Sequence, residues 1–249
     1  MGIVVAASAR NSGNEVYWAS QGRSQATSER ASQAGLRDAG TLTKLCELCP
    51  IIISVCPPEF AEEIAGQVAE LLYRGLYVDA NAISPERVQR IAHSMEERGA
   101  RFVDGGIIGP PTTVRNRTWL YLAGDAAADI AACFSAGPIE TEVLEGGIGR
   151  ASALKMCFAA YSKGSIALAS AVLTAAENLD VLDDLKRQWA RSGPSLPELE
   201  REISRAAPKA WRFVAEMLEI AATFESAGVP PEFHRAAAEI FRRFPRDTR

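Results

Sequence analysis

The chain has 249 residues, 47% of them hydrophobic, enough to bury a sizeable core in one large domain or two smaller ones. Its formal net charge of −4 argues against nonspecific nucleic-acid binding, which needs a basic surface. No apolar run approaches the roughly 20 residues of a membrane-spanning helix, and the first residues lack the basic segment of a secretory signal. We therefore expect a cytoplasmic protein without a nucleic-acid or membrane partner.

The cysteines and histidines offer little sign of metal or redox chemistry. Five scattered cysteines suit a reducing compartment better than a disulfide framework. Cys46 and Cys49 form a single Cys-x-x-Cys pair in a predicted helix just before a strand, with no second pair, and we interpret both as small buried hydrophobic residues. His93 and His234 lie in charged predicted helices. We predict no metal site.

The first 147 residues alternate between predicted helices and strands. The continuous β-branched run at 51–55 is typical of a parallel strand buried on both faces. Such alternation predicts an α/β fold with a Rossmann-like, doubly wound parallel sheet. In chain order we expect a helix at 2–11, a strand at 15–19, a helix at 25–34, strands at 51–55 and 76–79 separated by a helix at 59–72, a helix from 85 to 99, strands at 101–104 and 119–123, a helix at 126–135 and a strand at 141–144.

The pattern changes at a cluster of glycines over residues 146–149. Beyond it no strand pattern remains, and the first predicted helix, 151–178, would span roughly 40 Å at 1.5 Å per residue. We expect an α/β domain over 1–148 and an all-α domain over 149–249. The further helices are predicted at 182–191, 196–207, 209–227 and 231–242.

The N-terminal helix, a glycine stop, a strand and a basic turn follow the order of the second half of a dinucleotide-binding βαβ unit. The strand and most of the glycine-rich turn that precede such a helix are missing, so Gly2 is interpreted as the tail of a Gly-x-Gly-x-x-Gly loop. We interpret the chain as N-terminally truncated. The missing strand is expected between the strands that contain Val16 and Ile52.

The turn at residues 18–24 predicts the type of cofactor. It contains no acidic residue that would accept hydrogen bonds from ribose hydroxyls and repel a 2′-phosphate. Arg23 and Ser24 instead offer a guanidinium and a hydroxyl to a phosphate dianion. Ser24 and Thr27 can also cap the next helix, whose positive end favours the same phosphate. We therefore expect NADP (NADPH); the alternative is a solvated loop with one arginine.

Two further turns follow predicted strands, where ligands of such sheets bind. Val55, Cys56 and Pro57 are expected to line the nicotinamide pocket through their backbone. Asn81 is expected to contact the nicotinamide or its ribose, or else to be a simple turn residue.

Five motifs, taken together and in order, resemble the β-hydroxyacid dehydrogenase and 6-phosphogluconate dehydrogenase superfamily, and most closely its poorly characterised phosphogluconate dehydrogenase-like branch. The resemblance covers nearly the whole chain and implies an NAD(P)-binding domain followed by a helical domain that forms a homodimer. The motifs are GNEVYW at 13–18 with GRS at 22–24, SVCPP at 54–58, DANAISP at 79–85, VDGGIIG at 103–109 and ASALKM at 151–156.

The resemblance places the superfamily's catalytic lysine on Lys155. An ammonium there would donate a proton to the oxygen or nitrogen on which charge develops as hydride reaches a carbonyl or imine carbon. A surface lysine is the alternative. Lys163, eight residues on, is rotated by about 80° on an ideal helix and is less favoured.

Two departures from the superfamily bear on the substrate. The relatives carry an asparagine four residues after the lysine, where this chain has Ala159, and a Ser-Gly pair in the substrate loop, where this chain has Ile108 and Gly109. Gly106 belongs to the same loop. Both changes remove polar contacts, which favours a more apolar carbonyl or imine over a 3-hydroxy acid.

The sequence thus predicts a homodimeric NADP-dependent oxidoreductase that acts on a small carbonyl, hydroxy or imine substrate. One alternative is an imine or ketone reductase of secondary metabolism. The other is a non-catalytic dimeric relative that has lost its phosphate-binding loop.

Overall fold

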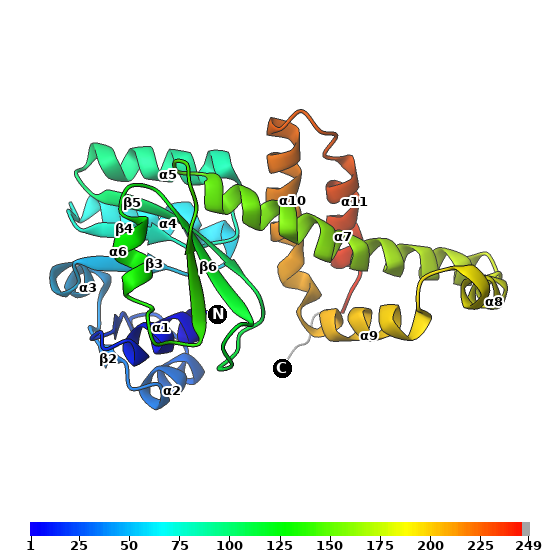
Figure 1. Ribbon diagram of the computed structural model, residues 1–249, viewed down its shortest axis with the longest axis horizontal. Helices are drawn as coiled ribbons and strands as arrows, with labels where there is room; N and C mark the ends of the chain where they lie inside the picture. Colours follow the sequence, from blue (N-terminus) through cyan, green and yellow to red (C-terminus); the bar gives the residue numbers. More distant parts are fainter. Residues whose placement is uncertain (246–249) are drawn as a thin grey trace. The chain divides into compact units, whose positions relative to one another are not determined.

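The computed structural model describes residues 1–245 (Figure 1). The chain divides into two compact units, Met1–Lys155 and Met156–Arg249. The division falls within the long helix α7 (Arg150–Asn178), which contributes its first turns to the first unit and the remainder to the second. The glycine cluster chosen as a boundary in the sequence directly precedes this helix.

The first unit alternates helices and strands, as predicted. One strand, β2, was missed, because both of its residues are polar and exposed. The elements are α1 (Gly2–Asn11), β1 (Tyr17–Trp18), α2 (Gln25–Gln33), β2 (Arg37–Asp38), α3 (Leu42–Leu48), β3 (Ile51–Ser54), the 3₁₀ turn η1 (Pro58–Phe60), α4 (Ala61–Glu70), β4 (Leu76–Asp79), α5 (Pro85–Glu97), β5 (Arg101–Ile108), β6 (Thr118–Ala123), α6 (Ala127–Ala132) and β7 (Ile139–Val143).

The main sheet has five strands in the order β3-β4-β5-β6-β7. All neighbours are parallel except β5 and β6, which are antiparallel. The connection between those two, residues 109–117, contains no helix, so the chain turns back as a hairpin instead of crossing over. The predicted Rossmann-like α/β class is confirmed, with this one reversal.

β1 and β2 form a separate two-stranded parallel sheet. β3 is an edge strand of the main sheet, and in the described part of the chain it pairs only with β4. The strands near Val16 and Ile52 therefore lie in different sheets. The strand expected between them stays a prediction.

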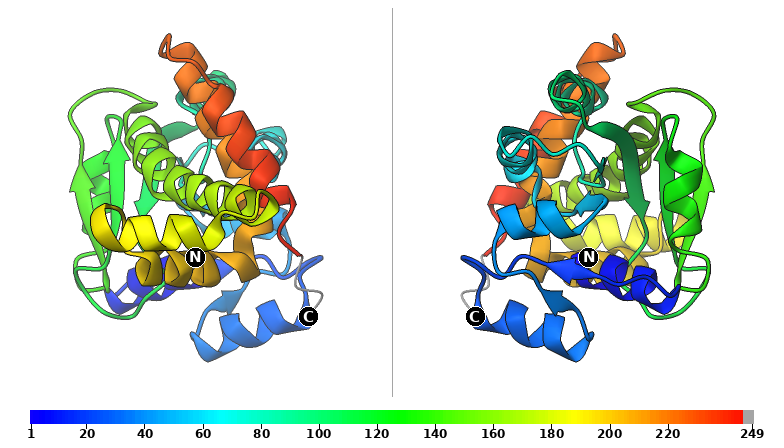
Figure 2. Two further views of the ribbon diagram at one scale, coloured as in Figure 1. Left: turned by 90° about the vertical axis from the view of Figure 1, so that its right-hand side faces the viewer. Right: turned by 90° about the vertical axis from the view of Figure 1, so that its left-hand side faces the viewer.

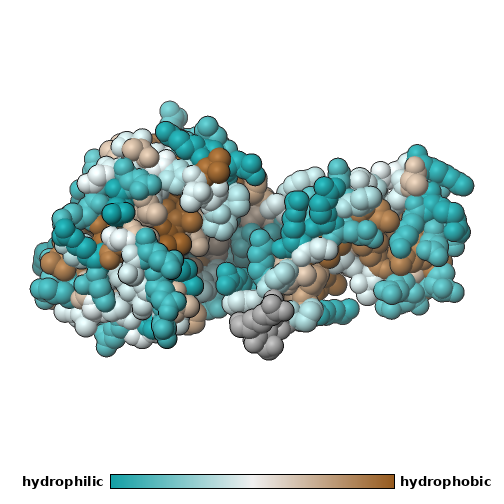
Figure 3. Space-filling view, turned by 90° about the horizontal axis from the view of Figure 1, so that it is seen from below, coloured by the Kyte–Doolittle hydropathy of each residue, from teal (hydrophilic) through white to brown (hydrophobic). Residues whose placement is uncertain are grey.

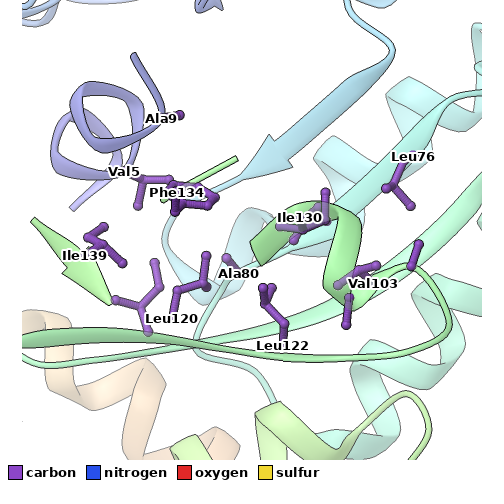
Figure 4. Packing of buried hydrophobic residues seen from close by; sticks show 14 residues of the cluster. Val5, Ala9, Leu76, Ala80, Val103, Leu120, Leu122, Ile130, Phe134 and Ile139 are labelled. Atoms are coloured by element: carbon purple, nitrogen blue, oxygen red, sulfur yellow. The ribbon is translucent and has the colours of Figure 1, made fainter. Parts of the chain in front are cut away.

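Alternation along the central strands divides the core of this unit between the two faces of the sheet. On β4, Leu76 and Val78 join a cluster with Val5 of α1 and Ile130 of α6 (Figure 4). The residue between them, Tyr77, points to the opposite cluster, which is built with α4 and α5. These two helices lie side by side (Figure 2). The period of two in a strand produces this division.

The second unit is all-helical, as predicted. α10 (Ala210–Ser226) and α11 (Glu232–Arg242) form a helical hairpin and lie side by side (Figure 2). Phe213 and Phe241 meet edge to face across it, with ring centroids 5.3 Å apart. The remaining elements are the later turns of α7, α8 (Leu182–Ser192), α9 (Leu196–Ala206) and the 3₁₀ turn η2 (Ala207–Lys209).

Candidate functional site

Three neighbouring parallel strands end in a buried polar row. Ser54 of β3 pairs in register with Asp79 of β4, which pairs with Asp104 of β5. All three residues are buried. Ligands of open α/β sheets bind at this carboxyl edge, so the candidate site is built from the turns that follow these strands.

Asn81 fixes the turn after β3. The backbone N–H of Cys56 donates to Asn81 Oδ1 at 2.6 Å, and Asn81 Nδ2 donates to Ser54 Oγ at 3.0 Å. Both ends of this buried amide are therefore occupied within the protein. Asn81 holds the backbone of the turn at 55–57, which was predicted to line the nicotinamide pocket. Its own contact with a cofactor stays a prediction.

The start of α1 and the turn after β1 reach the same edge. A Cβ placed on Gly2 would lie 3.8 Å from the backbone oxygen of Val55. Burial raises the pKa of the Cys56 thiol, while the positive charge of Arg23 acts on it in the opposite direction. Gly2 thus lies against the Val55–Cys56 turn, and the charge of Arg23 acts on the same turn.

The start of α2 carries a group of exposed polar side chains. The hydroxyls of Ser24 and Thr27 are 3.1 Å apart, and Arg30 Nη2 donates to Thr27 Oγ1 at 2.9 Å. Ser24 is the N-cap residue, but its side chain makes no capping hydrogen bond. The predicted capping by Ser24 is therefore wrong in this respect, because its hydroxyl faces a neighbouring hydroxyl.

An acidic residue that the sequence reasoning did not consider lies beside this turn. Asp38 of β2 accepts a hydrogen bond from the backbone N–H of Gly40 at 2.7 Å. Hydrogen bonds from Gly40 and from Ser20 lower the pKa of Asp38. Its carboxylate is thus engaged with the protein. Sequence reasoning missed it because β2 is short and polar.

Lys155 lies against the carboxyl half of β5. A Cβ on Gly106 would lie 3.3 Å from Lys155 Cβ and 2.6 Å from the backbone oxygen of Ala151, so only glycine lets α7 approach this closely. Lys155 is partly exposed. Gly106 is next to Gly105, where a Cβ would lie 3.0 Å from the backbone oxygen of Asp79 at the end of β4. Lys155 is thereby placed beside the strand ends that carry the turns described above.

The other predicted substrate residues occupy different environments. Ile108, the last residue of β5, is buried, and Gly109 is exposed with a φ of +125° that favours glycine. Ala159 lies one turn beyond Lys155 on α7 and is fully buried. Within residues 1–245 no group of three or more His, Cys, Asp or Glu side chains is arranged to hold a metal ion.

Asp79 has the most unusual electrostatic environment of the site. Its Oδ1 accepts the backbone N–H of Asn81 at 3.0 Å, whereas Oδ2 is buried and has no hydrogen-bond partner among the described residues. Burial is the main reason that the pKa of Asp79 is raised from 3.8 to about 6. The neighbouring Asp104 raises it further, and Arg87 lowers it.

The raised pKa of Asp79 predicts a pH-dependent stability. Between pH 4 and 6 folded Asp79 keeps a proton that the unfolded chain has lost, so its contribution to the free energy of unfolding falls as pH rises. As the pH rises from 4.5 to 7.5, we expect the free energy of unfolding of Asp79→Asn to increase by about 2 kcal/mol relative to that of the wild type. Urea unfolding at both pH values measures this, with exposed Asp125→Asn as control. A difference between Asp79→Asn and wild type that is the same at both pH values would contradict it.

The chain is similar in sequence to known protein families and to a relative of unknown function. Residues 1–135 match the model of the NAD binding domain of 6-phosphogluconate dehydrogenase, and residues 176–244 match a domain of unknown function, DUF1932. An uncharacterized 28.5 kDa protein in the 7S RNA 5′ region of Methanothermus fervidus is 29% identical over 171 residues. The match covers 69% of this chain and 65% of that protein, so it spans less than two thirds of the relative's length.

Solved structures share the fold over almost the whole chain. The conserved protein MTH1747, of unknown function and described as similar to 3-hydroxyacid dehydrogenases, has a TM-score of 0.69 and 27% identity, covering 97% of this chain and 92% of its own. Mycobacterium tuberculosis 3-hydroxyisobutyrate dehydrogenase has a TM-score of 0.70 and 15% identity, with coverages of 98% and 90%. An Aspergillus terreus reductive aminase in complex with NADPH has a TM-score of 0.57 and 18% identity, with coverages of 98% and 89%. The last two resemble this chain in fold alone.

Proposed function

The chain belongs to the family defined by the NAD-binding domain of 6-phosphogluconate dehydrogenase, and we propose that it is an NADP-dependent oxidoreductase acting on a small carbonyl, hydroxy or imine substrate. The observation that carries the proposal is the position of Lys155 beside Gly106, at the strand edge that also carries the Cys56 turn. This edge is where the fold binds dinucleotides. Bound there, the cofactor supplies or accepts the hydride.

NADP rather than NAD is proposed because of the charge at the start of α2. Arg23 is exposed, and its charge acts on the Cys56 thiol. The nearby hydroxyls of Ser24 and Thr27 add hydrogen-bond donors for a phosphate.

Arg23→Ala should separate the two cofactors. Losing a charge-assisted hydrogen bond costs about 1.5–3 kcal/mol, so the Kd for NADPH should rise by roughly 10-fold or more while that for NADH changes by less than about 2-fold. Calorimetric titration with both cofactors measures this, with exposed Arg98→Ala as the matched control. Equal weakening of NADPH and NADH would contradict the phosphate contact. Absence of saturation with either cofactor in the wild type would favour a non-catalytic dimeric relative.

We assign Lys155 the role of proton donor in reduction and acceptor in oxidation. Its ammonium would meet the substrate's oxygen or nitrogen as negative charge or basicity develops there. The backbone of the Cys56 turn, held by Asn81, would orient the nicotinamide. Buried Ile108 and Ala159 offer no polar group to a substrate carboxylate, and this favours an imine or ketone reductase as the second candidate.

Lys155→Met keeps the length of the side chain and removes its charge. We expect turnover to fall by about 10²-fold or more, the usual contribution of a positioned acid–base group, with little change in the Kd for NADPH. Wild type and variant would be screened with NADPH against 3-keto acids, ketones and cyclic imines, and exposed Lys44→Met would serve as control. Unchanged turnover in Lys155→Met would remove the lysine from the mechanism. The preferred class in the screen decides between the two enzyme functions.

A homodimer through the C-terminal helices is proposed from the surface of α7. Tyr161 and Leu168 lie within a narrow arc of this helix, Leu179 directly follows its last residue, and the three are 82%, 53% and 71% exposed. The most apolar 18-residue window of α7 has a mean hydropathy of 1.4 and is only 39% buried; by length and composition alone it could also cross a membrane. Apolar surface is visible on both units in Figure 3. A second copy would cover this stripe.

The α7 stripe should therefore control the oligomeric state. Light scattering after size-exclusion chromatography is expected to give about twice the 26.8 kDa mass of the chain. Leu168→Glu combined with Leu179→Glu should yield the monomer, because each places a charge in an apolar contact. Leu48→Glu, on exposed α3, should leave the mass unchanged. A monomeric wild type, or a dimer unaffected by the double substitution, would exclude this interface.

A further inference from the structure

The carboxylate of Asp104 is completely buried and binds the start of α7. Its Oδ2 accepts the backbone N–H groups of Gly149, Ala151 and Ser152 at 2.9, 2.8 and 3.1 Å. Its Oδ1 accepts the hydroxyl of Ser152 at 2.7 Å. A helix leaves its first N–H groups without partners inside the helix. Here they are bound by a side chain at least 45 positions earlier in the sequence.

The same face of β5 also receives the second turn of α7. Asp104 and Gly106 are two residues apart on the strand, so their side-chain positions point to one face. Asp104 holds residues 149–152, and Gly106 gives the space in which Ala151 and Lys155 approach the strand. The carboxylate thus fixes the helix along its axis, and the glycine fixes its distance from the sheet.

The electrostatics around Asp104 involve its burial, its hydrogen bonds and the dipole of α7. Burial raises the pKa of Asp104, while the hydrogen bonds from Ser152, Gly149 and Ala151 act in the opposite direction because they favour the ionised form. The positive end of the α7 dipole also favours a carboxylate at this position. The site therefore contains a carboxylate that binds the start of the helix that carries the lysine.

We propose that Asp104 is a positioning residue for the reaction, which holds Lys155 at the strand edge by anchoring the first turn of α7. This inference rests on the role proposed for Lys155. Asp104 acts through the backbone of residues 149–152 and through Ser152, not on the substrate. Its removal should therefore change where Lys155 is held while leaving the cofactor turns at Cys56 and Arg23 intact.

Four proteins test the proposal: the full-length wild type, Ser152→Ala, Asp104→Asn and Asp104→Ala. Ser152→Ala removes one hydrogen bond, Asp104→Asn keeps one acceptor oxygen, and Asp104→Ala removes all four bonds. Two measurements are made on each: amide hydrogen exchange over residues 149–156, and the rate of reductive methylation of each lysine with formaldehyde and a borane, followed by mass spectrometry. Lys44 and Lys209 are the internal controls for methylation.

We expect exchange over residues 149–156 to accelerate in the order Ser152→Ala, Asp104→Asn, Asp104→Ala, by about 10-fold or more in the last. Methylation of Lys155 should change in the same order, by about 3-fold or more in Asp104→Ala, while Lys44 and Lys209 react as in the wild type. In Asp104→Asn, we expect both the exchange rate over residues 149–156 and the methylation rate of Lys155 to lie between those of the wild type and Asp104→Ala. If Asp104→Ala does not fold, the comparison of Ser152→Ala and Asp104→Asn with the wild type decides.

Faster exchange with unchanged methylation of Lys155 would overturn the proposal, because Asp104 would then only cap the helix. Equal changes at all lysines would also overturn it, since they would report general loosening. Both measurements are made without substrate. Failure of the proposed function, shown by lack of NADPH saturation or by an active Lys155→Met protein, is therefore distinguishable from failure of this inference.

Discussion

The contact between β5 and the start of α7 is the constraint on which the candidate site depends. Asp104 binds the helix end with four hydrogen bonds, and Gly106 leaves no side chain between the strand and the helix. The lysine assigned to proton transfer is carried on the second turn of that helix. A rigid strand thus sets its position, as precise sites require, whereas a loop would leave it mobile.

The cofactor side of the site depends on a second buried polar group. Asn81 joins the turn after β3 to Ser54, and Asp79 holds the backbone of Asn81. Buried polar groups of this kind specify one arrangement when they are satisfied and destabilise the fold where they are not. Within residues 1–245, Oδ2 of Asp79 has no hydrogen-bond partner and is such a cost. It lies at the strand ends, where strain and buried charge are expected to accompany function.

Periodicity in the sequence was sufficient to predict the α/β class, the all-helical second half and nearly all helices and strands. β2 was not predicted because Arg37 and Asp38 have no apolar pattern. The antiparallel direction of β6 was not predicted because strand direction depends on the connection and not on the strand's own residues. Asp104 was not singled out for the same kind of reason: its partners are 45 to 48 residues away, and only the folded chain brings them together. The amide of Asn81 likewise turned out to be engaged inside the protein.

Binding of the nicotinamide at the edge formed by the Cys56 turn, Gly106 and Lys155 can be followed by titrating ¹⁵N-labelled protein with NADPH and recording amide chemical shifts. We expect saturable shifts at Gly2, at residues 23–24 and 55–57, and at Gly106 and Lys155, with the exposed amides of α8 unaffected. Shifts confined to other regions, or no saturable shifts at this edge, would contradict it.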